Sequence, residues 1–587
     1  MRLIKTAIDF GDYDENQDNV LLGDWCLKNV ADILGDITKY NKIPYHWDDR
    51  EKYARDYLYL NKVYEETLLQ LVLLLNEIHS TNHNLRYWRI VIGPWLRYFI
   101  DVLFDRYECV KQAKEIGRIT KSTIYSYDLD DVCPASFDEF WSEFTTDEWN
   151  EIVFSECLLE LSIPYSLCND TLVINKPATT NSLNFFDILK DKLKSLGNIY
   201  SKLLGRLQTG PVIINAYTSF YKVIKFQLQL KQLPYLFNLK PGFVASKKDL
   251  LLREKFSKIF VSSDQFECLL ARLIPLFMPK SYIEDFLKLR RNALNTLPKN
   301  PKSIFTANAY LADEVFKIWA AEKTSQGIPL IIGQHGGNFG MVYLHQSEEH
   351  QVKIADNFAS WGWEDKMKDK IISLPSFQLS GRAPINPNFN GSILHVLSSL
   401  PRYFYQYYSM PVSGQFLLYI KSQIKFLNKL EIKYLDNVII RLDASASSRA
   451  WDIPKALAFG GFSKYIDTSN DSILALLSKS RLCVCTHNAT VFLETLALNF
   501  PTVIFWEPSH NEMRTDATPF FDILVEAGIL FYTPEAAAKK VNIIEHNVEE
   551  WWFSEQVQSA RQQFCQRYAR VSTDWAHEWS DFLLKLK

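Results

Sequence analysis

The chain has 587 residues, of which 47% are hydrophobic and 14% aromatic, as expected of a globular protein with two or three cores. Lys and Arg total 65 against 68 for Asp and Glu, and the resulting net charge of −3 excludes nucleic acid as the main partner. Nine scattered cysteines form no disulfide framework. Because no secretory signal is visible and the longest apolar run, 68–75, is too short to cross a bilayer, we expect a cytoplasmic protein.

The first part of the chain predicts long amphipathic helices over 51–79 and 86–110, and short strands at 20–26 and 210–219. Asp48 and Asp49 precede the first helix and suit its first turn, where acids complement the helix dipole. Asp128 and Asp130 match the Asp-x-Asp signature of metal-dependent sugar transferases, but three letters outside the α/β regions are a weak motif. We interpret neither pair as a site.

An α/β pattern begins at residue 303, with a strand over 303–307, a helix over 313–327 that ends in Gly, and a strand over 328–334. The strand ends in Gln334, His335, Gly336 and Gly337, at the carboxyl edge where open parallel sheets bind ligands. Glycine lets backbone approach a ligand, and an imidazole can take a proton from an acceptor hydroxyl or stabilise a leaving phosphate. We therefore predict a catalytic turn; the alternative is a turn histidine that only hydrogen-bonds backbone.

From Gly391 onward, short apolar runs alternate with helical stretches, which predicts a parallel sheet covered by helices on both faces. The strands are expected within 391–400, 436–443, 481–487 and 501–506, and the Pro/Asn/Gly-rich stretch 381–391 marks a boundary. The predicted organisation is an N-terminal acceptor-side α/β domain over 1–385 with helical insertions, a C-terminal Rossmann-like donor domain over 386–550, and a C-terminal helical segment over 551–587 that packs back on the N-terminal domain.

Donor-binding residues are predicted at the carboxyl ends of these strands. Arg441 offers a bidentate fork to a phosphate, or else forms a structural ion pair with Asp443 or another local acid. The next strand hands over to a helix whose N–H groups favour a phosphate, through Thr486, His487, Asn488, Ala489 and Thr490; Asn488 or Thr490 could equally be an N-cap. Glu494 could accept bonds from sugar hydroxyls or be a surface residue. Further residues assigned to the cleft are Asn308, Asn338, Arg402 and Glu507.

Several long stretches then resemble, in order, a family of transferases found in bacterial O-antigen and surface-polysaccharide gene clusters. They include "YHWDDREKYARDYLYL", "IIGQHGGNFG", "NATVFLETLALNFPTVIFW" and "WWFSEQVQSAR", and the resemblance covers nearly the whole chain. It implies a sugar or related transferase of lipopolysaccharide or capsule assembly. A more distant likeness to glycerol-phosphate-polymerising transferases places His335, Arg441 and the 486–490 turn in corresponding order. The related capsule Kdo transferases carry Asp where His335 stands, so a carboxylate nucleophile is not expected there.

We therefore predict an α/β protein with two Rossmann-like domains facing a cleft, as in GT-B enzymes, and a large helical elaboration in the N-terminal half. Its predicted function is glycosyl transfer from a nucleotide-sugar donor to a lipid-linked or glycan acceptor, with peripheral association at the cytoplasmic face of the inner membrane. Arg441, a helix N-terminus and glycine N–H groups would neutralise the leaving phosphate, so no metal and no cofactor beyond the nucleotide-sugar substrate are expected. The alternatives are an alditol-phosphate transferase, a nucleotide-sugar epimerase and a non-catalytic assembly scaffold.

Overall fold

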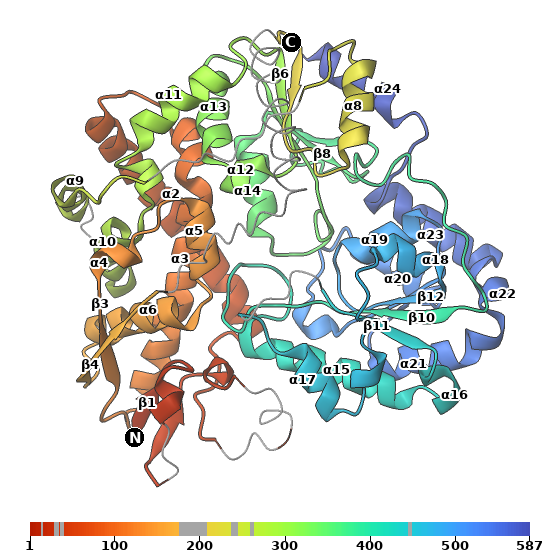
Figure 1. Cartoon of the computed structure of the whole chain (residues 1–587), viewed down its shortest axis with the longest axis horizontal. Coiled ribbons are helices and arrows are strands. Elements are labelled where there is room, and N and C mark those ends of the chain that lie inside the picture. Colours follow the sequence, from red (N-terminus) through yellow and green to blue (C-terminus); the bar gives the residue numbers. More distant parts are fainter. Residues whose placement is uncertain are drawn as a thin grey trace, which may run out of the picture. The chain divides into compact units, whose positions relative to one another are not determined.

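A computed structural model describes residues 1–12, 16–28, 35, 40–174, 208–235, 245–258, 263–443 and 449–586 (Figure 1). The chain folds as two compact units that are each discontinuous in sequence. Unit 1 comprises Met1–Ala54, Gly336–Gln346 and Ser360–Trp575, and unit 2 comprises Arg55–His335, Ser347–Ala359 and Ala576–Lys587. This division by compactness follows lines different from the predicted domains, whose boundaries at 385 and 550 stay a prediction.

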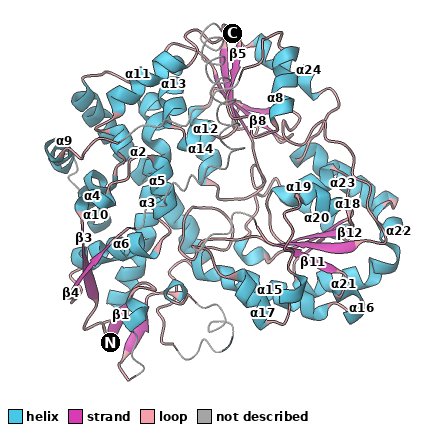
Figure 2. Ribbon diagram, viewed as in Figure 1, coloured by secondary structure: helices cyan, strands magenta, loops and turns pink. Residues whose placement is uncertain are grey.

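Unit 1 is built around a parallel sheet with the order β11-β10-β12-β13-β14. Its strands are β10 (Ser392–Val396), β11 (Val438–Arg441), β12 (Ser480–Cys485), β13 (Thr502–Phe505) and β14 (Leu530–Phe531). Every residue of β12 and β13 is buried, as a strand covered on both faces requires. Figure 2 shows helices on both sides of these strands, so the predicted doubly covered parallel sheet is confirmed.

The helices of unit 1 begin where the sequence supplies a cap or a proline. Asp452 caps α17, Ser472 caps α18, and Pro534 opens α21 at a position where a missing N–H costs nothing. The helices around the sheet are α15 (Phe416–Lys429), α16 (Ile432–Leu435), α17 (Ile453–Phe459), α18 (Ile473–Ser478), α19 (Thr490–Ala497), α20 (Thr518–Glu526), α21 (Pro534–Ile544), α22 (Val548–Trp552) and α23 (Glu555–Tyr568).

Unit 2 contains strands paired in the order β5-β6-β7-β8, all parallel. They are β5 (Pro211–Ile213), β6 (Ser303–Thr306), β7 (Leu330–Gly333) and β8 (Asn357–Ser360). The helix between β6 and β7, α13 (Glu314–Ser325), is capped by Asp313, which accepts a bond from the N–H of Phe316 at 2.9 Å. It is followed by Gly327 at φ +85°, so the predicted strand–helix–Gly–strand pattern is confirmed.

The helical elaboration of the N-terminal half is also confirmed. It consists of α2 (Arg50–His79), α3 (Leu85–Glu115), α4 (Leu129–Val132), α5 (Phe137–Glu143), α6 (Asp147–Glu160), α8 (Phe220–Gln229), α9 (Leu250–Glu254), α10 (Gln265–Phe277) and α11 (Phe286–Thr296), with α12 (Ala309–Ala312), α14 (Gln346–Ile354) and α24 (Trp575–Lys585) elsewhere in the chain. Shorter strand pairs are β1 (Arg2–Ile4) with β2 (Asn19–Leu21) and β3 (Thr123–Tyr127) with β4 (Ser166–Leu172), and β9 spans Ile371–Ser373.

Among the described residues, no helix combines the length and apolarity that a membrane span needs.

Two predicted strands are shorter than expected. The one expected at 210–219 ends at Ile213, because Asn215 and Tyr217 both adopt φ +51°, which interrupts an extended chain. The one expected at 20–26 ends at Leu21 and continues into a 3₁₀ turn, Asp24–Cys26.

The acids set aside in the sequence have structural roles. Asp49 accepts bonds from the N–H groups of Glu51 and Lys52 in the first turn of α2. Asp128 caps α4 by accepting from the N–H of Asp130 at 2.8 Å. Both acids therefore act at helix starts: for Asp49 this is the first-turn role expected from the sequence, whereas for Asp128 no structural role was predicted.

The buried His395 of β10 generates a prediction about stability and pH. Its side chain has no exposed surface, its Nε2 lies 3.0 Å from Gln423 Oε1, and burial lowers its pKa to about 4. Because this pKa is lower in the folded state than in the unfolded chain, the contribution to stability is complete above about pH 6.5 and is lost as the pH falls toward 4. We expect this loss to be on the order of 3 kcal/mol, and His395→Gln to remove it.

The free energy of unfolding of the wild type and of His395→Gln is measured by urea denaturation at about pH 7 and about pH 4. The advantage of the wild type over His395→Gln should narrow on acidification. A difference that does not change with pH would show that His395 is not held neutral by the fold.

Candidate functional site

The sheet of unit 1 has a shared carboxyl edge at which three predicted segments meet. Val396 of β10 pairs with Arg441 of β11 on one side and with Cys485 of β12 on the other. The residues after each strand therefore emerge at one level. In an open parallel sheet this edge is where ligands bind.

A hollow lies at this edge, with about 460 Å³ of empty space including the part open to solvent. Its walls combine apolar, aromatic and polar side chains from α15, from the ends of β12 and β13 and from the start of α21: Pro411, Leu418, Tyr419, Ser422, Gln423, Thr486, His487, Phe505, Trp506, Glu507, His510, Asn511 and Pro534. Three of the predicted residues, Thr486, His487 and Glu507, line this hollow.

Thr486 is held in place by the neighbouring elements. Its hydroxyl donates to the carbonyl of Val396 at 2.9 Å and lies 2.7 Å from the hydroxyl of Tyr419, which accepts from the N–H of Ser398 at 2.7 Å. These bonds fasten the ends of β10 and β12 to α15. Thr486 thus forms the wall of the hollow.

His487 and Asn488 carry polar atoms that the protein does not satisfy. The Nδ1 of His487 and the Oδ1 of Asn488 are buried and have no hydrogen-bond partner among the described residues. Burial lowers the pKa of His487 to about 4, against the attraction of Asp443, so its ring is neutral near pH 7. Buried polar atoms without a partner are costly, and a ligand that hydrogen-bonds them would remove that cost.

The start of α19 lies against the predicted glycine turn. Ala489 occupies the N-cap position and gives no side-chain cap, and Thr490 Oγ1 accepts a bond from the N–H of Gly337 at 3.1 Å. A Cβ on Gly337 would lie 2.3 Å from the carbonyl carbon of Ala489, whereas one on Gly336 would lie 3.2 Å from Thr490 Oγ1. The structure therefore brings the 336–337 and 486–490 segments together within unit 1.

Arg441 and Glu494 each have an ion-pair partner in the fold. Arg441 Nη1 lies 2.7 Å from Asp467 Oδ2, so its partner is a local acid other than Asp443. Glu494 is buried and lies 3.1 Å from Arg382 Nη2; burial raises its pKa and Arg382 opposes that rise. Glu494 is therefore not the exposed surface residue of the alternative interpretation.

Two residues assigned to the cleft have positions of their own. Arg402 is buried, donates to the carbonyl of Trp25 and is not among the residues that line the hollow. Asn338 follows the glycine turn at φ +72°, and its Oδ1 is buried without a partner among the described residues.

The remaining predicted residues belong to unit 2 and gather at the carboxyl edge of its own sheet. Gln334 continues β7 and donates its N–H to the carbonyl of Ala359 at 2.9 Å. His335 comes next, with its ring centroid 5.6 Å from that of Tyr217 and 6.5 Å from that of Tyr310. Asn308 follows β6, and its Oδ1 is buried without a partner in the described part of the chain.

The electrostatics of His335 favour a neutral ring. Burial lowers its pKa to about 4, although backbone hydrogen bonds with Gly333 and Ala307 act in the opposite direction. A neutral imidazole near pH 7 has one ring nitrogen that can accept a proton and one N–H that can donate a hydrogen bond. Both predicted roles, base for the acceptor hydroxyl and hydrogen-bond donor to a leaving phosphate, are compatible with this state.

Tyr217 and Tyr310 are the residues that sequence reasoning missed. Tyr217 lay inside a stretch predicted to be a strand, yet its φ of +51° marks a conformation that an aromatic residue adopts rarely and at some cost. Such strain often accompanies functional sites. The sequence signal was available in the Asn-Ala-Tyr-Thr-Ser run after β5, which suits a turn better than a strand.

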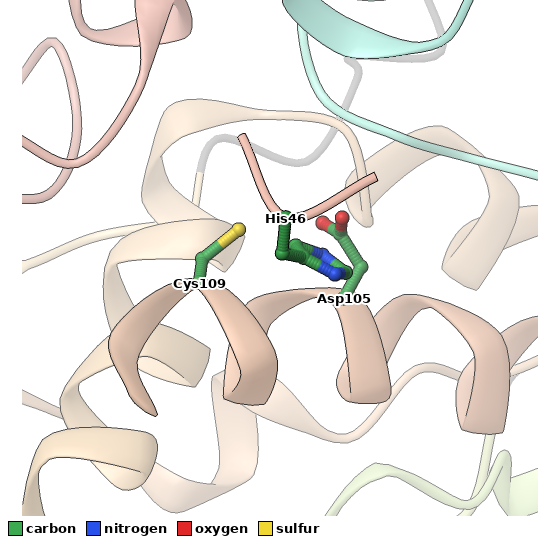
Figure 3. Close-up of side chains that lie close together, drawn as sticks. All are labelled: His46, Asp105 and Cys109. Atoms are coloured by element: carbon green, nitrogen blue, oxygen red, sulfur yellow. The ribbon is translucent and has the colours of Figure 1, made fainter. Parts of the chain in front are cut away.

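In unit 2, the α3 side chains of Asp105 and Cys109 lie on successive helical turns (Figure 3). Asp105 forms an ion pair with Arg106 at 2.7 Å, and burial raises the pKa of the Cys109 thiol well above its usual value. Asp105 is therefore the acid of a buried ion pair, and Cys109 carries a protonated thiol. His46, also labelled in Figure 3, belongs to unit 1.

A protein-family model described as "LIC12162 family transferase" matches residues 1–583. No curated protein matches the sequence.

Solved structures similar to this chain include three proteins at 10% sequence identity. They are MurG from Acinetobacter baumannii (TM-score 0.33, 64% of this chain and 99% of that one), WaaG, a glycosyltransferase involved in lipopolysaccharide biosynthesis (TM-score 0.27, 51% and 95%), and an α,α-trehalose-phosphate synthase (UDP-forming) from Burkholderia vietnamiensis (TM-score 0.33, 64% and 97%).

The contrast between the two glycines predicts unequal effects of the same substitution. Gly337→Ala should destabilise the protein by about 1–3 kcal/mol, the usual range for overpacking, because the added carbon meets the backbone of Ala489. Gly336→Ala is the matched control, since its added carbon meets only the movable hydroxyl of Thr490. Urea denaturation of both variants measures the difference, and equal losses would contradict the close contact.

Proposed function

Because the chain belongs to the LIC12162 family of transferases, we propose that it transfers a glycosyl group from a nucleotide-sugar donor to a lipid-linked or glycan acceptor. We propose that this reaction belongs to O-antigen, lipopolysaccharide or capsule assembly. Unit 1 supplies the donor site and unit 2 supplies the base that activates the acceptor hydroxyl.

The hollow at the carboxyl edge of the unit 1 sheet is the observation that supports this proposal most. It is lined by the aromatic rings of Tyr419 and Trp506 and by the part-buried His487, whose Nδ1 lacks a partner in the described residues. Aromatic faces suit a base or a sugar ring, and a neutral imidazole suits a hydroxyl or an amide. A nucleotide sugar offers all of these groups.

The diphosphate of the donor is proposed to lie at the start of α19. The first N–H groups of that helix receive no side-chain cap from Ala489 and provide partial positive charge. Among the described residues, Arg441 bonds to Asp467 and Ser469 through its Nη1 atom alone, and we propose that other N–H groups of the guanidinium bind a phosphate oxygen. With these groups the proposal needs no divalent cation.

His335 is proposed as the general base of unit 2. Its lowered pKa keeps the ring neutral at physiological pH, and Tyr217 and Tyr310 flank it on the same edge. The proton moves from the acceptor hydroxyl to an imidazole nitrogen as that oxygen attacks the anomeric carbon, and the bond to the leaving nucleotide phosphate breaks. In this proposal His335 is a catalytic residue and not a purely structural one.

A nucleotide should raise the melting temperature, because a ligand that binds only the folded state stabilises it by mass action, by about 2.7 kcal/mol at a hundredfold excess over Kd. The test is a thermal-shift screen with CMP, CDP, UDP, GDP and dTDP. If none of the five nucleotides raised the melting temperature, this would contradict the proposed donor site and favour a non-catalytic assembly scaffold.

Arg441→Ala and Asp467→Asn form the matched pair for the phosphate contact. Both variants break the 2.7 Å ion pair, but only Arg441→Ala removes the guanidinium. We expect only Arg441→Ala to weaken nucleotide binding, by at least tenfold in Kd, since hydrogen bonds to charged groups contribute roughly 1.5–3 kcal/mol. Equal nucleotide affinity in the two variants would make the ion pair purely structural.

Removing the base should lower turnover with little change in donor binding. His335→Ala is expected to reduce kcat by roughly 100- to 10,000-fold while the nucleotide thermal shift persists. In the wild type the rate should stay level through pH 6.5 and fall only as the pH approaches about 4, because the base must be unprotonated.

His577→Ala is the control, since His577 is an exposed histidine of the same unit. It should behave as the wild type in both assays. Near-normal turnover of His335→Ala, or a wild-type rate that already falls near pH 6.5, would show that His335 is a structural turn residue and not the base.

A further inference from the structure

Helix α8 of unit 2 presents an apolar and basic outer face (yellow helix in Figure 1). Val223, Phe226, Gln227 and Leu230 are buried, at the spacing of one helical face. The opposite face carries Tyr221, Lys225 and Leu228 at i, i+4 and i+7, with Tyr221 75% and Leu228 58% exposed. Phe220 at the start of the helix and Leu233 after its end are also more than half exposed.

The sequence around this helix contains basic residues and no acidic ones. Residues 192–248 contain ten Lys or Arg and no Asp or Glu, in a chain whose net charge is −3. Lys225 and Lys231 are exposed, and in the described part of the chain neither forms an ion pair with a carboxylate. By contrast, the exposed Leu69 and Leu73 of α2 lie among acids such as Glu66 and Glu77.

From this juxtaposition of exposed rings, leucines and unpaired lysines we propose that α8 is a membrane-binding surface that recognises anionic lipid. Aromatic and leucine side chains enter the boundary between headgroups and acyl chains, while lysines remain with the phosphates. Charge complementarity commits the surface to an anionic bilayer, because a neutral apolar partner would not require an acid-free basic segment.

The position of α8 connects this surface to the acceptor. The helix begins at Phe220, three residues after Tyr217, whose ring contacts His335 at the edge of the unit 2 sheet. A bilayer held by α8 would therefore bring a membrane-anchored acceptor to the segment that bears the base. This second step rests on the proposed function and identifies the acceptor as lipid-linked; the membrane contact itself does not depend on it.

Vesicle co-sedimentation of the full chain, without donor or acceptor, tests the surface. The probes are vesicles of phosphatidylcholine alone and vesicles that also contain phosphatidylglycerol. The wild type should pellet with the anionic vesicles, far less with the neutral ones, and less as salt is added. Tyr221→Ser with Leu228→Ser, and separately Lys225→Glu with Lys231→Glu, should each weaken binding at least tenfold.

Matched controls are Leu69→Ser with Leu73→Ser for apolarity and Lys62→Glu with Lys288→Glu for net charge, all on exposed sites of unit 2. They should bind as the wild type does, and every variant should keep its melting temperature and its nucleotide shift. Failure of the wild type to bind anionic vesicles would overturn the proposal and favour an acidic protein partner. Equal loss in the controls would also overturn it. A lost nucleotide shift with intact vesicle binding would instead count against the proposed function alone.

Discussion

The close approach of two backbones, at Gly337 and Ala489, is the contact on which the candidate donor site depends. A Cβ at Gly337 would lie within 2.3 Å of the carbonyl carbon of Ala489, so only glycine fits. The same approach lets the N–H of Gly337 bond to Thr490 Oγ1 and places the turn beside the start of α19. The chain then continues along a second segment, with Val342 bridged to Met513 and Arg514 donating its N–H to Met341. The glycines after His335 therefore serve to anchor this turn in unit 1.

The anchoring has a chemical consequence because the chain passes from unit 2 to unit 1 between His335 and Gly336. The histidine stays with the sheet of unit 2, where burial holds it neutral, while the next residue already belongs to the unit that carries the hollow. One short segment thus contributes to two sheets.

The sequence indicated the α/β layers because their cause is local. A strand covered on both faces needs a continuous apolar run, as in β12, and a helix needs a cap and a terminator, as Asp313 and Gly327 provide for α13. Interactions between distant residues leave no such signal. Asp467 pairs with Arg441 from 26 positions away, and Arg382 pairs with Glu494 from 112 positions away. The early end of β5 was missed because the Asn-Ala-Tyr-Thr-Ser run, whose composition suits a turn, was assigned to the strand that precedes it.

The central claim is that the carboxyl edge of the unit 1 sheet holds a nucleotide, and a crystal structure of the full chain with the best-stabilising nucleotide tests it most directly. The account predicts phosphate density at the first N–H groups of α19, within hydrogen-bond distance of Arg441, and a base or sugar ring in the hollow lined by Tyr419, His487 and Trp506. Well-ordered nucleotide density at any other place, with this hollow filled only by solvent, would contradict it.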